Sequence, residues 1–367
     1  MPPADRDRCV LGPLREPIAR RLDDEVRASD LGSPHAAIVT RYTRAAAKDP
    51  RSRTDWWVGA FSGAGLATLG TLAAAQLFEL YGIAAFVVTP IAAGALSAWL
   101  CGLRVKQPIQ RCMTASLMAQ GIVFAVLLGF GIEGAICLIM AAPITAPLAL
   151  IGAVFAYYFQ PGGAPRPGPR GFPVILPAIL LAPFAALVAE KQLALQPPLH
   201  RVVTAVGIAA PPDVVWRRVV DFPALPPATH WLFRAGVAAP RCARIDGCGV
   251  GAVRYCEFTT GPFVEPIEVW DEPRLLRFAV TSSPAPMTEL SPYDVHPPHL
   301  HGFLNSRRGQ FRLIALPDGG TRLEGTTWYD NRMWPQAYWR LWSDAVIHEI
   351  HRTVLRHVRD LAENDAR

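Results

Sequence analysis

Charged residues are scarce in this chain of 367 residues. Asp, Glu, Lys and Arg make up 18% of it and hydrophobic residues 51%, whereas about a quarter of the residues in an ordinary soluble domain are charged. The shortage is concentrated between residues 56 and 189, where long apolar runs contain almost no charge. This distribution excludes a protein that is soluble along its whole length, and it predicts a membrane part joined to a soluble part.

Signatures of metal catalysis and nucleic-acid binding are also missing. The stretch HEIH (348–351) lacks the HExxH spacing of zinc proteases. Three of the seven cysteines, Cys242, Cys248 and Cys256, lie in the last third of the chain. Their odd number gives no disulfide framework, although an oxidising compartment would permit one disulfide among them. The net charge of +6 comes mostly from basic residues beside the apolar runs and indicates no nucleic-acid patch. We therefore expect no cofactor and no nucleic-acid partner.

Five apolar runs are long enough to cross the hydrocarbon core of a bilayer, which takes about 20 residues. They cover residues 56–78, 82–103, 112–131, 134–159 and 172–189. The fifth has eighteen residues, three of them proline, so an interfacial helix is the alternative there. The preferred interpretation is an integral membrane protein with about five spans, whose first partner is the lipid bilayer.

The basic residues predict how these spans are oriented. Arg104, Lys106 and Arg111 lie between the second and third runs, whereas the connections 79–81 and 132–134 contain no Lys or Arg. The positive-inside rule therefore places the N-terminus in the cytoplasm. Five spans put the C-terminal domain on the outer side of the membrane. The Arg/Ala/Pro-rich composition indicates a bacterial source, so this is the periplasmic side of a bacterial inner membrane. An interfacial fifth segment would leave that domain in the cytoplasm.

We assign no functional role to the acidic residues and cysteines in or near the ends of these runs. Glu79 and Glu133 fall in tight turns on one membrane face, where we expect them to be solvated. Cys101, Cys112 and Cys137 fall in or at the ends of spans, where a thiol behaves as a small apolar residue.

The chain divides into four parts by composition. Residues 1–55 form a polar arm, 56–189 the membrane domain, 190–200 a linker with a proline pair, and 201–364 a soluble domain. The last part begins with a strand and a short helix, continues with strand-like runs separated by turns, and ends in a long amphipathic helix from about residue 334.

Two segments of the last part make the order of its elements similar to that of a known family. IAAPPDVVW (208–216) follows a strand and opens a helix, and GVGAVRYCEFTTGPFVEPIEVWDEPRLLRF (249–278) supplies the middle of a meander. Residues 200–363 resemble the START-like helix-grip superfamily, the SRPBCC group of polyketide cyclase/dehydrase and lipid-transport domains. The resemblance implies an α+β fold in which a curved antiparallel sheet surrounds a long C-terminal helix. It also implies an apolar cavity between them for hydrophobic ligands.

Two charged residues are candidates for that cavity. If Phe258 pairs with Phe263 across the TTGP turn, Arg254 and Glu265 become diagonal neighbours on one face of a hairpin. A polar pair in an apolar pocket orients a ligand. The alternatives are a structural ion pair, or a register that leaves both residues in solvent.

Other polar groups are expected around the sheet and the last helix. Thr327 and Tyr329 share a face with Leu323 and are candidates for hydrogen bonding to a ligand, although both are also common strand formers. Trp270 is expected on the outer face of its strand. On the last helix, His348 should point to solvent, away from the apolar arc.

The stretch HPPHLHG (296–302) lies in a loop of about 25 residues, which is too long for a simple hairpin. The prolines of this loop restrict its conformations, and its apolar residues give it one apolar side. We expect it to form a flap over the cavity mouth or to touch the bilayer. His299, Leu300, His301 and Phe303 are therefore candidates for contacting the ligand.

A metal site on the loop histidines is the alternative interpretation. His296, His299 and His301 would need a fourth ligand, for which Asp294 and Glu289 are available. The prolines oppose the turn that would bring three imidazoles together, and the spacing matches no known metal-site pattern. No metal is expected.

Three functions are consistent with these features. The preferred one is a membrane-anchored module that binds or transfers a lipid or another hydrophobic small molecule. The second is a cyclase, dehydratase or hydrolase using Arg254, Glu265 and a loop histidine. The third is a non-catalytic sensor or interaction domain. The missing catalytic signature favours binding over catalysis.

Overall fold

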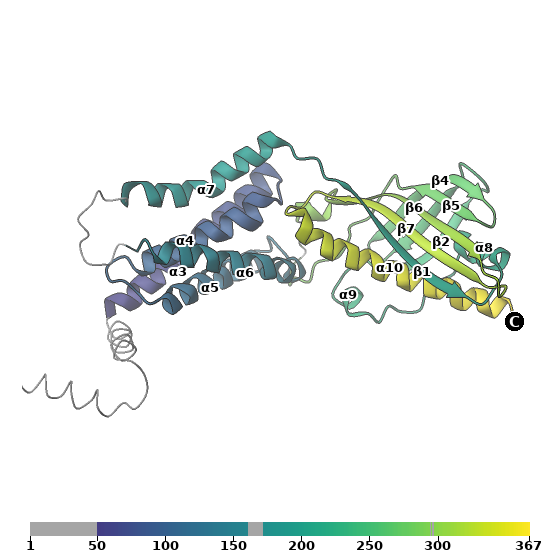
Figure 1. Cartoon of the computed structure of the whole chain (residues 1–367), viewed down its shortest axis with the longest axis horizontal. Coiled ribbons are helices and arrows are strands. Elements are labelled where there is room, and N and C mark those ends of the chain that lie inside the picture. Colours follow the sequence, from purple (N-terminus) through teal and green to yellow (C-terminus); the bar gives the residue numbers. More distant parts are fainter. Residues whose placement is uncertain (1–49, 161–171, 294, 296) are drawn as a thin grey trace, which may run out of the picture.

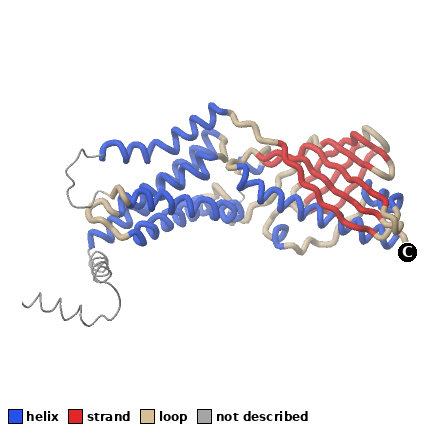
Figure 2. The backbone as a smooth tube through the Cα atoms, viewed as in Figure 1, coloured by secondary structure: helices blue, strands red, loops and turns tan. Residues whose placement is uncertain are grey.

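The structure is a computed structural model that describes residues 50–160, 172–293, 295 and 297–367. Most of the predicted N-terminal arm lies outside the described residues, as do Asp294 and His296 of the loop. A group of long helices comes first along the chain, and a sheet with a long helix follows it (Figures 1 and 2). The predicted fold class is confirmed.

The first group contains five helices that are long and apolar enough to cross a membrane. Helix α3 (Pro50–Leu72) continues as the π-helix η1 (Ala73–Phe78), and η2 (Ala84–Val88) leads into α4 (Thr89–Cys101). Helices α5 (Ile109–Gly129), α6 (Ala135–Tyr157) and α7 (Phe172–Leu193) follow. The predicted number of long apolar helices is confirmed, and the uncertain fifth segment is a helix of sufficient length to span.

Small residues allow the bundle helices to pack closely. A Cβ atom added to Gly94 of α4 would lie 1.9 Å from the carbonyl oxygen of Ala149, and one added to Gly152 of α6 would lie 2.0 Å from that of Ile91. No side chain larger than hydrogen fits at either position. The backbones of α4 and α6 therefore touch, as is usual where membrane helices associate without a hydrophobic driving force.

The second group forms one antiparallel sheet of seven strands in the order β1-β7-β6-β5-β4-β3-β2. Its strands are β1 (Leu199–Ile208), β2 (Pro240–Asp246), β3 (Val253–Phe258), β4 (Gly261–Asp271), β5 (Leu275–Ala279), β6 (Leu304–Ala315) and β7 (Thr321–Asn331). Its helices are α8 (Pro212–Val220), α9 (Trp231–Arg234), the 3₁₀ turn η3 (Pro298–Leu300) and α10 (Gln336–Asp365). The sheet curls around α10 (Figure 1).

The core of this part lies between the inner face of the sheet, α8 and α10. Trp216 of α8, Leu276 of β5, Leu323 of β7 and Leu355 of α10 are each at most 2% exposed and belong to one apolar cluster. Alternate strand residues point inward, so a period of two in the sequence supplies one face of this core.

The hairpin of β3 and β4 corrects the predicted register. Phe258 pairs with Gly261, so the loop is the two residues 259–260 instead of the expected TTGP. Two-residue loops match the twist of a hairpin, and Gly261 has a φ of +131°, which glycine adopts without strain. The register shifts by two residues, which preserves the faces. Arg254 and Glu265 consequently lie directly opposite each other instead of diagonally.

The prediction for Trp270 was wrong. The register of β4 against β5 shifts between Ile267 and Val269, an irregularity of the β-bulge kind. Such a bulge changes which residues point inward beyond it. Trp270 therefore packs against the core, where its ring lies 5.5 Å from that of Trp216.

The two parts meet at the end of the bundle formed by the turns before α4 and α6. The backbone N–H of Trp334 donates to the carbonyl of Tyr81 at 2.9 Å, and that of Ala135 donates to the carbonyl of Leu290 at 3.0 Å. The hydroxyl of Tyr338, on the first turn of α10, donates to the carbonyl of Met140 in α6. The C-terminal part is thus docked on the bundle at several points.

Candidate functional site

A cavity of about 100 Å³ lies between the curled sheet and α10. Its walls are largely aromatic and aliphatic, and its polar lining comes from Arg254, Glu265, Thr327 and His351, among other groups. A seven-stranded antiparallel sheet wrapped around a C-terminal helix, with a cavity between them, defines the fold. The C-terminal part has the helix-grip fold.

No protein-family model and no curated protein matches the sequence. Solved structures similar to the helix-grip domain include the aromatase/cyclase ZhuI from a Streptomyces species (18% identity, TM-score 0.31, 46% of this chain and 97% of that one). Another is norcoclaurine synthase from Thalictrum flavum (12% identity, TM-score 0.31, 47% of this chain and 98% of that one). A third is the Aha1 dimer from Colwellia psychrerythraea (14% identity, TM-score 0.27, 45% of this chain and 96% of that one). At these identities the similarity concerns the fold alone.

Arg254 and Glu265 form a buried ion pair at one wall of the cavity. Nη1 of Arg254 donates to Oε2 of Glu265, and the two residues are 1% and 6% exposed. Burial acts to lower the pKa of Arg254, but the carboxylate outweighs it and the net shift is upward, so the guanidinium stays protonated. Burial raises the pKa of Glu265, and the guanidinium opposes that effect. Of the interpretations above, exposure of the pair to solvent is ruled out.

The guanidinium of Arg254 is only partly satisfied by the protein. Its Nε and Nη2 atoms have no hydrogen-bond partner among the described residues. Its central carbon lies 5.5 to 5.6 Å from the ring centroids of Phe222, Phe278 and Phe311, within the range of cation–π attraction. Aromatic faces stabilise the charge, but they accept no strong hydrogen bond. Two buried donors are therefore available for an acceptor.

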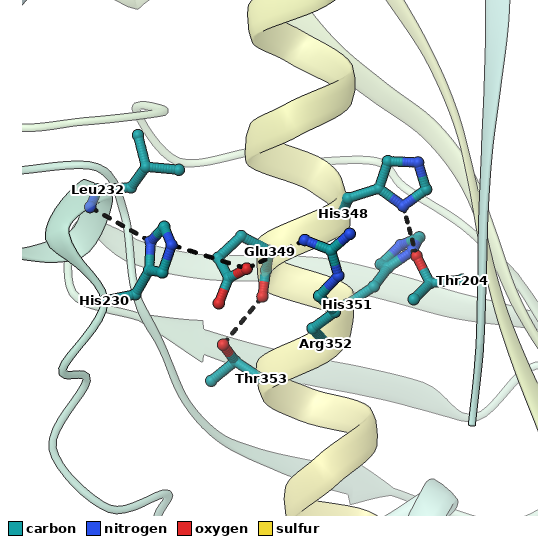
Figure 3. A network of polar contacts seen from close by, with 8 residues as sticks. All are labelled: Thr204, His230, Leu232, His348, Glu349, His351, Arg352 and Thr353. Atoms are coloured by element: carbon teal, nitrogen blue, oxygen red, sulfur yellow. Dashed lines mark hydrogen bonds and ion pairs between the residues drawn. The ribbon is translucent and has the colours of Figure 1, made fainter. Parts of the chain in front are cut away.

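A second polar group lines the cavity from α10. Nε2 of His351 lies 2.8 Å from the hydroxyl of Thr327, and its Nδ1 lies 3.1 Å from the hydroxyl of Thr204 on β1. The same hydroxyl lies 2.8 Å from Nδ1 of His348, as Figure 3 shows. The prediction that His348 points to solvent was therefore wrong, because the curled end strand β1 covers this side of α10.

The opposite side of α10 carries a different set of contacts. Glu349 is 9% exposed and lies 4.0 Å from Nε2 of His230, at the start of α9, and 3.4 Å from Nη1 of Arg352 (Figure 3). These groups connect α9 to α10 and lie outside the cavity lining.

Tyr329 lies beside the cavity without lining it. Its ring packs with Val202 and Ile347, and its hydroxyl donates to Asp344 at 2.6 Å. Burial raises its pKa, as does the hydrogen bond to that carboxylate. Of the two β7 candidates, only Thr327 is on the cavity wall.

Cys256 is the cysteine among the described residues that line the cavity, and it lies beside the ion pair. Burial raises its pKa to about 12, although the neighbouring Arg254 acts to lower it. The thiol is therefore protonated at neutral pH, and only the thiolate is a strong nucleophile.

The loop candidates occupy a different place from the one expected. His299, Leu300, His301 and Phe303 are all described residues, and none of them lines the helix-grip cavity. They lie instead at the junction with the bundle. The rings of His299 and Phe303 are 4.8 Å and 5.3 Å from that of Tyr81, Leu300 packs on the start of α6, and His301 is exposed.

A buried polar cluster surrounds His299 at this junction. The hydroxyl of Tyr81 donates to Oε1 of Glu133 at 2.8 Å, and Nδ1 of His299 lies 3.6 Å from Oε2 of that carboxyl. Glu133 is 5% exposed, so the prediction that it is solvated was wrong: the docked domain removes water from its turn. Burial raises the pKa of Glu133 to about 8 and lowers that of His299 to about 4.

Sequence reasoning missed several of these groups. His351 was not among the candidate residues, because helical spacing alone does not show that the curled sheet reaches this side of α10. Cys137 was interpreted as apolar, but its Sγ contacts Glu289 and His299. No sequence spacing relates these three residues, since only the docking of two domains brings them together.

The burial of His351 predicts an acid-dependent loss of stability. Burial, and secondarily His348, lowers the pKa of His351 to about 4 in the folded protein, whereas an unfolded histidine titrates near 6.5. The unfolded chain therefore binds more protons between these values, so acid favours unfolding. At pH 5 the effect reaches about 2 kcal/mol. We expect the thermal midpoint of the detergent-purified protein to fall from pH 7 to pH 5, and to fall less in His351→Gln.

The matched control is His301→Gln, in which an exposed histidine is replaced. It should retain the wild-type pH dependence. A His351→Gln variant whose midpoint falls as steeply as that of the wild type would contradict this interpretation of the cavity wall.

Proposed function

We propose that the helix-grip domain binds a hydrophobic small molecule that carries a hydrogen-bond acceptor, such as a carbonyl or carboxylate oxygen, and that the five helices hold this domain at a lipid bilayer for binding or transfer. One observation carries the proposal. Arg254, a residue of the cavity lining, is protonated and buried among aromatic rings, and two of its donor atoms have no partner among the described residues. An unsatisfied buried donor costs about 1–3 kcal/mol, which an acceptor on a ligand would recover.

The size of the cavity restricts the ligand. About 100 Å³ is comparable to the engineered cavity of about 150 Å³ that binds benzene. A single ring, or the end of a longer apolar chain, is the part of a ligand that this volume accommodates. The carbonyl or carboxylate would lie against Arg254, with Glu265 holding the guanidinium in place.

The chemistry of the lining favours binding over catalysis. The Cys256 thiol is protonated at neutral pH. Both nitrogens of His351 already face threonine hydroxyls. The carboxyl of Glu265 is engaged by Arg254. A cyclase, dehydratase or hydrolase needs a free acid, base or nucleophile at the reacting atom, and these groups are occupied.

The junction supplies a route between bilayer and domain in this proposal. His301 and Phe303 line an open groove of about 670 Å³ together with the end of α7, and Leu300 packs on α6. We assign 1–55 to the arm, 56–189 to the membrane domain, 190–200 to the linker and 201–364 to the helix-grip domain. The N-terminus is cytoplasmic in this scheme, and the helix-grip domain lies on the outer side of a bacterial inner membrane.

Ligand binding is tested by native mass spectrometry and solvent extraction of the full-length protein purified in detergent. We expect a hydrophobic compound with a carbonyl or carboxylate group to copurify with the wild type. Thr327→Leu fills the cavity and should remove the compound. Arg254→Met deletes the charged donors and should reduce its occupancy by about tenfold or more, because hydrogen bonds to charged groups contribute about 1.5–3 kcal/mol.

Arg312→Met is the control for the second variant, since Arg312 is an exposed residue of β6 in the same sheet. It should retain wild-type occupancy. Thermal midpoints of all variants distinguish loss of ligand from loss of fold. Equal amounts of compound in the wild type and Thr327→Leu, or none in a folded wild type, would overturn the proposal.

Orientation is tested with the exposed thiol of Cys248, in the loop between β2 and β3. A membrane-impermeant maleimide added to spheroplasts of an expressing bacterium should label the protein, and Cys248→Ser should abolish most of the label. Cys242→Ser, which changes a half-buried thiol, is the control. Labelling only after lysis would place the domain in the cytoplasm instead.

A further inference from the structure

Four side chains of metal-ligand type meet where the helix-grip domain docks on the bundle. Glu133 lies in the turn before α6 and Cys137 in the first turn of that helix, whereas Glu289 and His299 belong to the loop between β5 and β6. The hydrogen bond from the N–H of Ala135 to the carbonyl of Leu290 fixes this loop against the start of α6. Two ligands thus come from each domain.

Three of these side chains present atoms close enough to share one ion, and Glu289 lies beside two of the three. Glu133, Cys137 and His299 each present a ligand atom within 4.8 Å of the other two. Nε2 of His299 lies 2.8 Å from Sγ of Cys137 and 4.0 Å from Oε1 of Glu289, which also contacts that sulfur. Nδ1 of the same ring lies 3.6 Å from Oε2 of Glu133.

Two atoms in this cluster have no partner. Nδ1 of His299 and Oε2 of Glu289 are buried without a hydrogen bond in the described part of the chain, and their residues are 6% and 8% exposed. Within that part, no Lys or Arg forms an ion pair with either Glu133 or Glu289. Two carboxyl groups and a thiol beside one imidazole are costly to bury unless a cation or bound protons compensate them.

We propose that Glu133, Cys137, Glu289 and His299 bind one Zn²⁺ ion between the two domains. Zinc takes four ligands from Cys, His and carboxylate side chains at about 2.0–2.3 Å, which places the ligand atoms of a tetrahedron about 3.5 Å apart. From Nε2 of His299, the separations of 2.8 Å to Sγ of Cys137 and 4.0 Å to Oε1 of Glu289 bracket that value. Glu133 joins through its place within 4.8 Å of the other ligand atoms of Cys137 and His299. A thiolate and an imidazole select zinc over Mg²⁺ and Ca²⁺, which prefer oxygen alone.

The surroundings suit a structural ion. Ile136, Met287 and Leu300 form an apolar cluster at the same junction, which limits access of water. Tyr81 donates to Glu133 and orients that carboxyl, as outer hydrogen bonds do for metal ligands. The ion would fasten the loop of the helix-grip domain to α6. HPPHLHG contributes one ligand only, which is why its own histidine spacing predicts no site.

Metal content of the full-length protein in detergent provides the test. After incubation with ZnCl₂ and removal of unbound metal, we expect one Zn²⁺ per chain by inductively coupled plasma mass spectrometry. Cys137→Ser and His299→Gln should each weaken zinc binding by at least about tenfold. Co²⁺ in place of zinc should give a thiolate charge-transfer band that disappears in Cys137→Ser.

Cys248→Ser and His301→Gln are the matched controls, because they remove an exposed thiol and an exposed loop histidine. Both should retain stoichiometric metal and the cobalt band. A chelator should lower the thermal midpoint of the wild type but not that of Cys137→Ser, which separates metal loss from misfolding. A wild type that binds no zinc, or a His299→Gln variant that binds it as tightly, would overturn the proposal and leave a cluster neutralised by protons.

Discussion

A guanidinium group buried beneath a curved sheet is the constraint on which the C-terminal half depends. Removing one partner of such a pair costs about 3–5 kcal/mol, because the other charge is left unpaired. Glu265 faces Arg254 directly across the hairpin, and three phenylalanine rings surround the charge. The same arrangement leaves two donor atoms of this cavity-lining residue without a partner in the described part of the chain. In the proposed function, these two donors bind an acceptor on another molecule.

The junction determines where that cavity lies. The loop between β5 and β6 packs against the turns before α4 and α6, and the first turn of α10 donates a hydrogen bond to α6. The helix-grip domain is therefore docked on one end of an apolar bundle (Figure 1). In the proposed function, a cavity held at a bilayer shortens the path through water of a hydrophobic ligand, whose solubility there is low. The buried cluster around His299 is a second polar centre, and it belongs to the docking surface and not to the cavity.

Much of the fold follows from local sequence pattern. Long uncharged runs predict the five helices, and alternation predicts that Arg254 and Glu265 share an inner face. The exact pairing of β3 with β4 depends on the length of the loop between them. The dipeptide Thr259–Thr260 is not a typical hairpin-turn sequence, so the predicted register was wrong by two residues. Trp270 was misplaced because a register shift in β4 breaks the alternation. Glu133, Cys137 and His299 could not be grouped from sequence, since their proximity depends entirely on domain docking.

An experimental structure of the purified full-length protein, at a resolution that reveals bound small molecules, tests the central claim most directly. The claim predicts density for a non-protein group in the cavity, with an acceptor atom within hydrogen-bonding distance of Nε or Nη2 of Arg254 and an apolar body against Phe278 and Phe311. A cavity filled by protein side chains, with both donors bound to protein oxygen atoms, would contradict it.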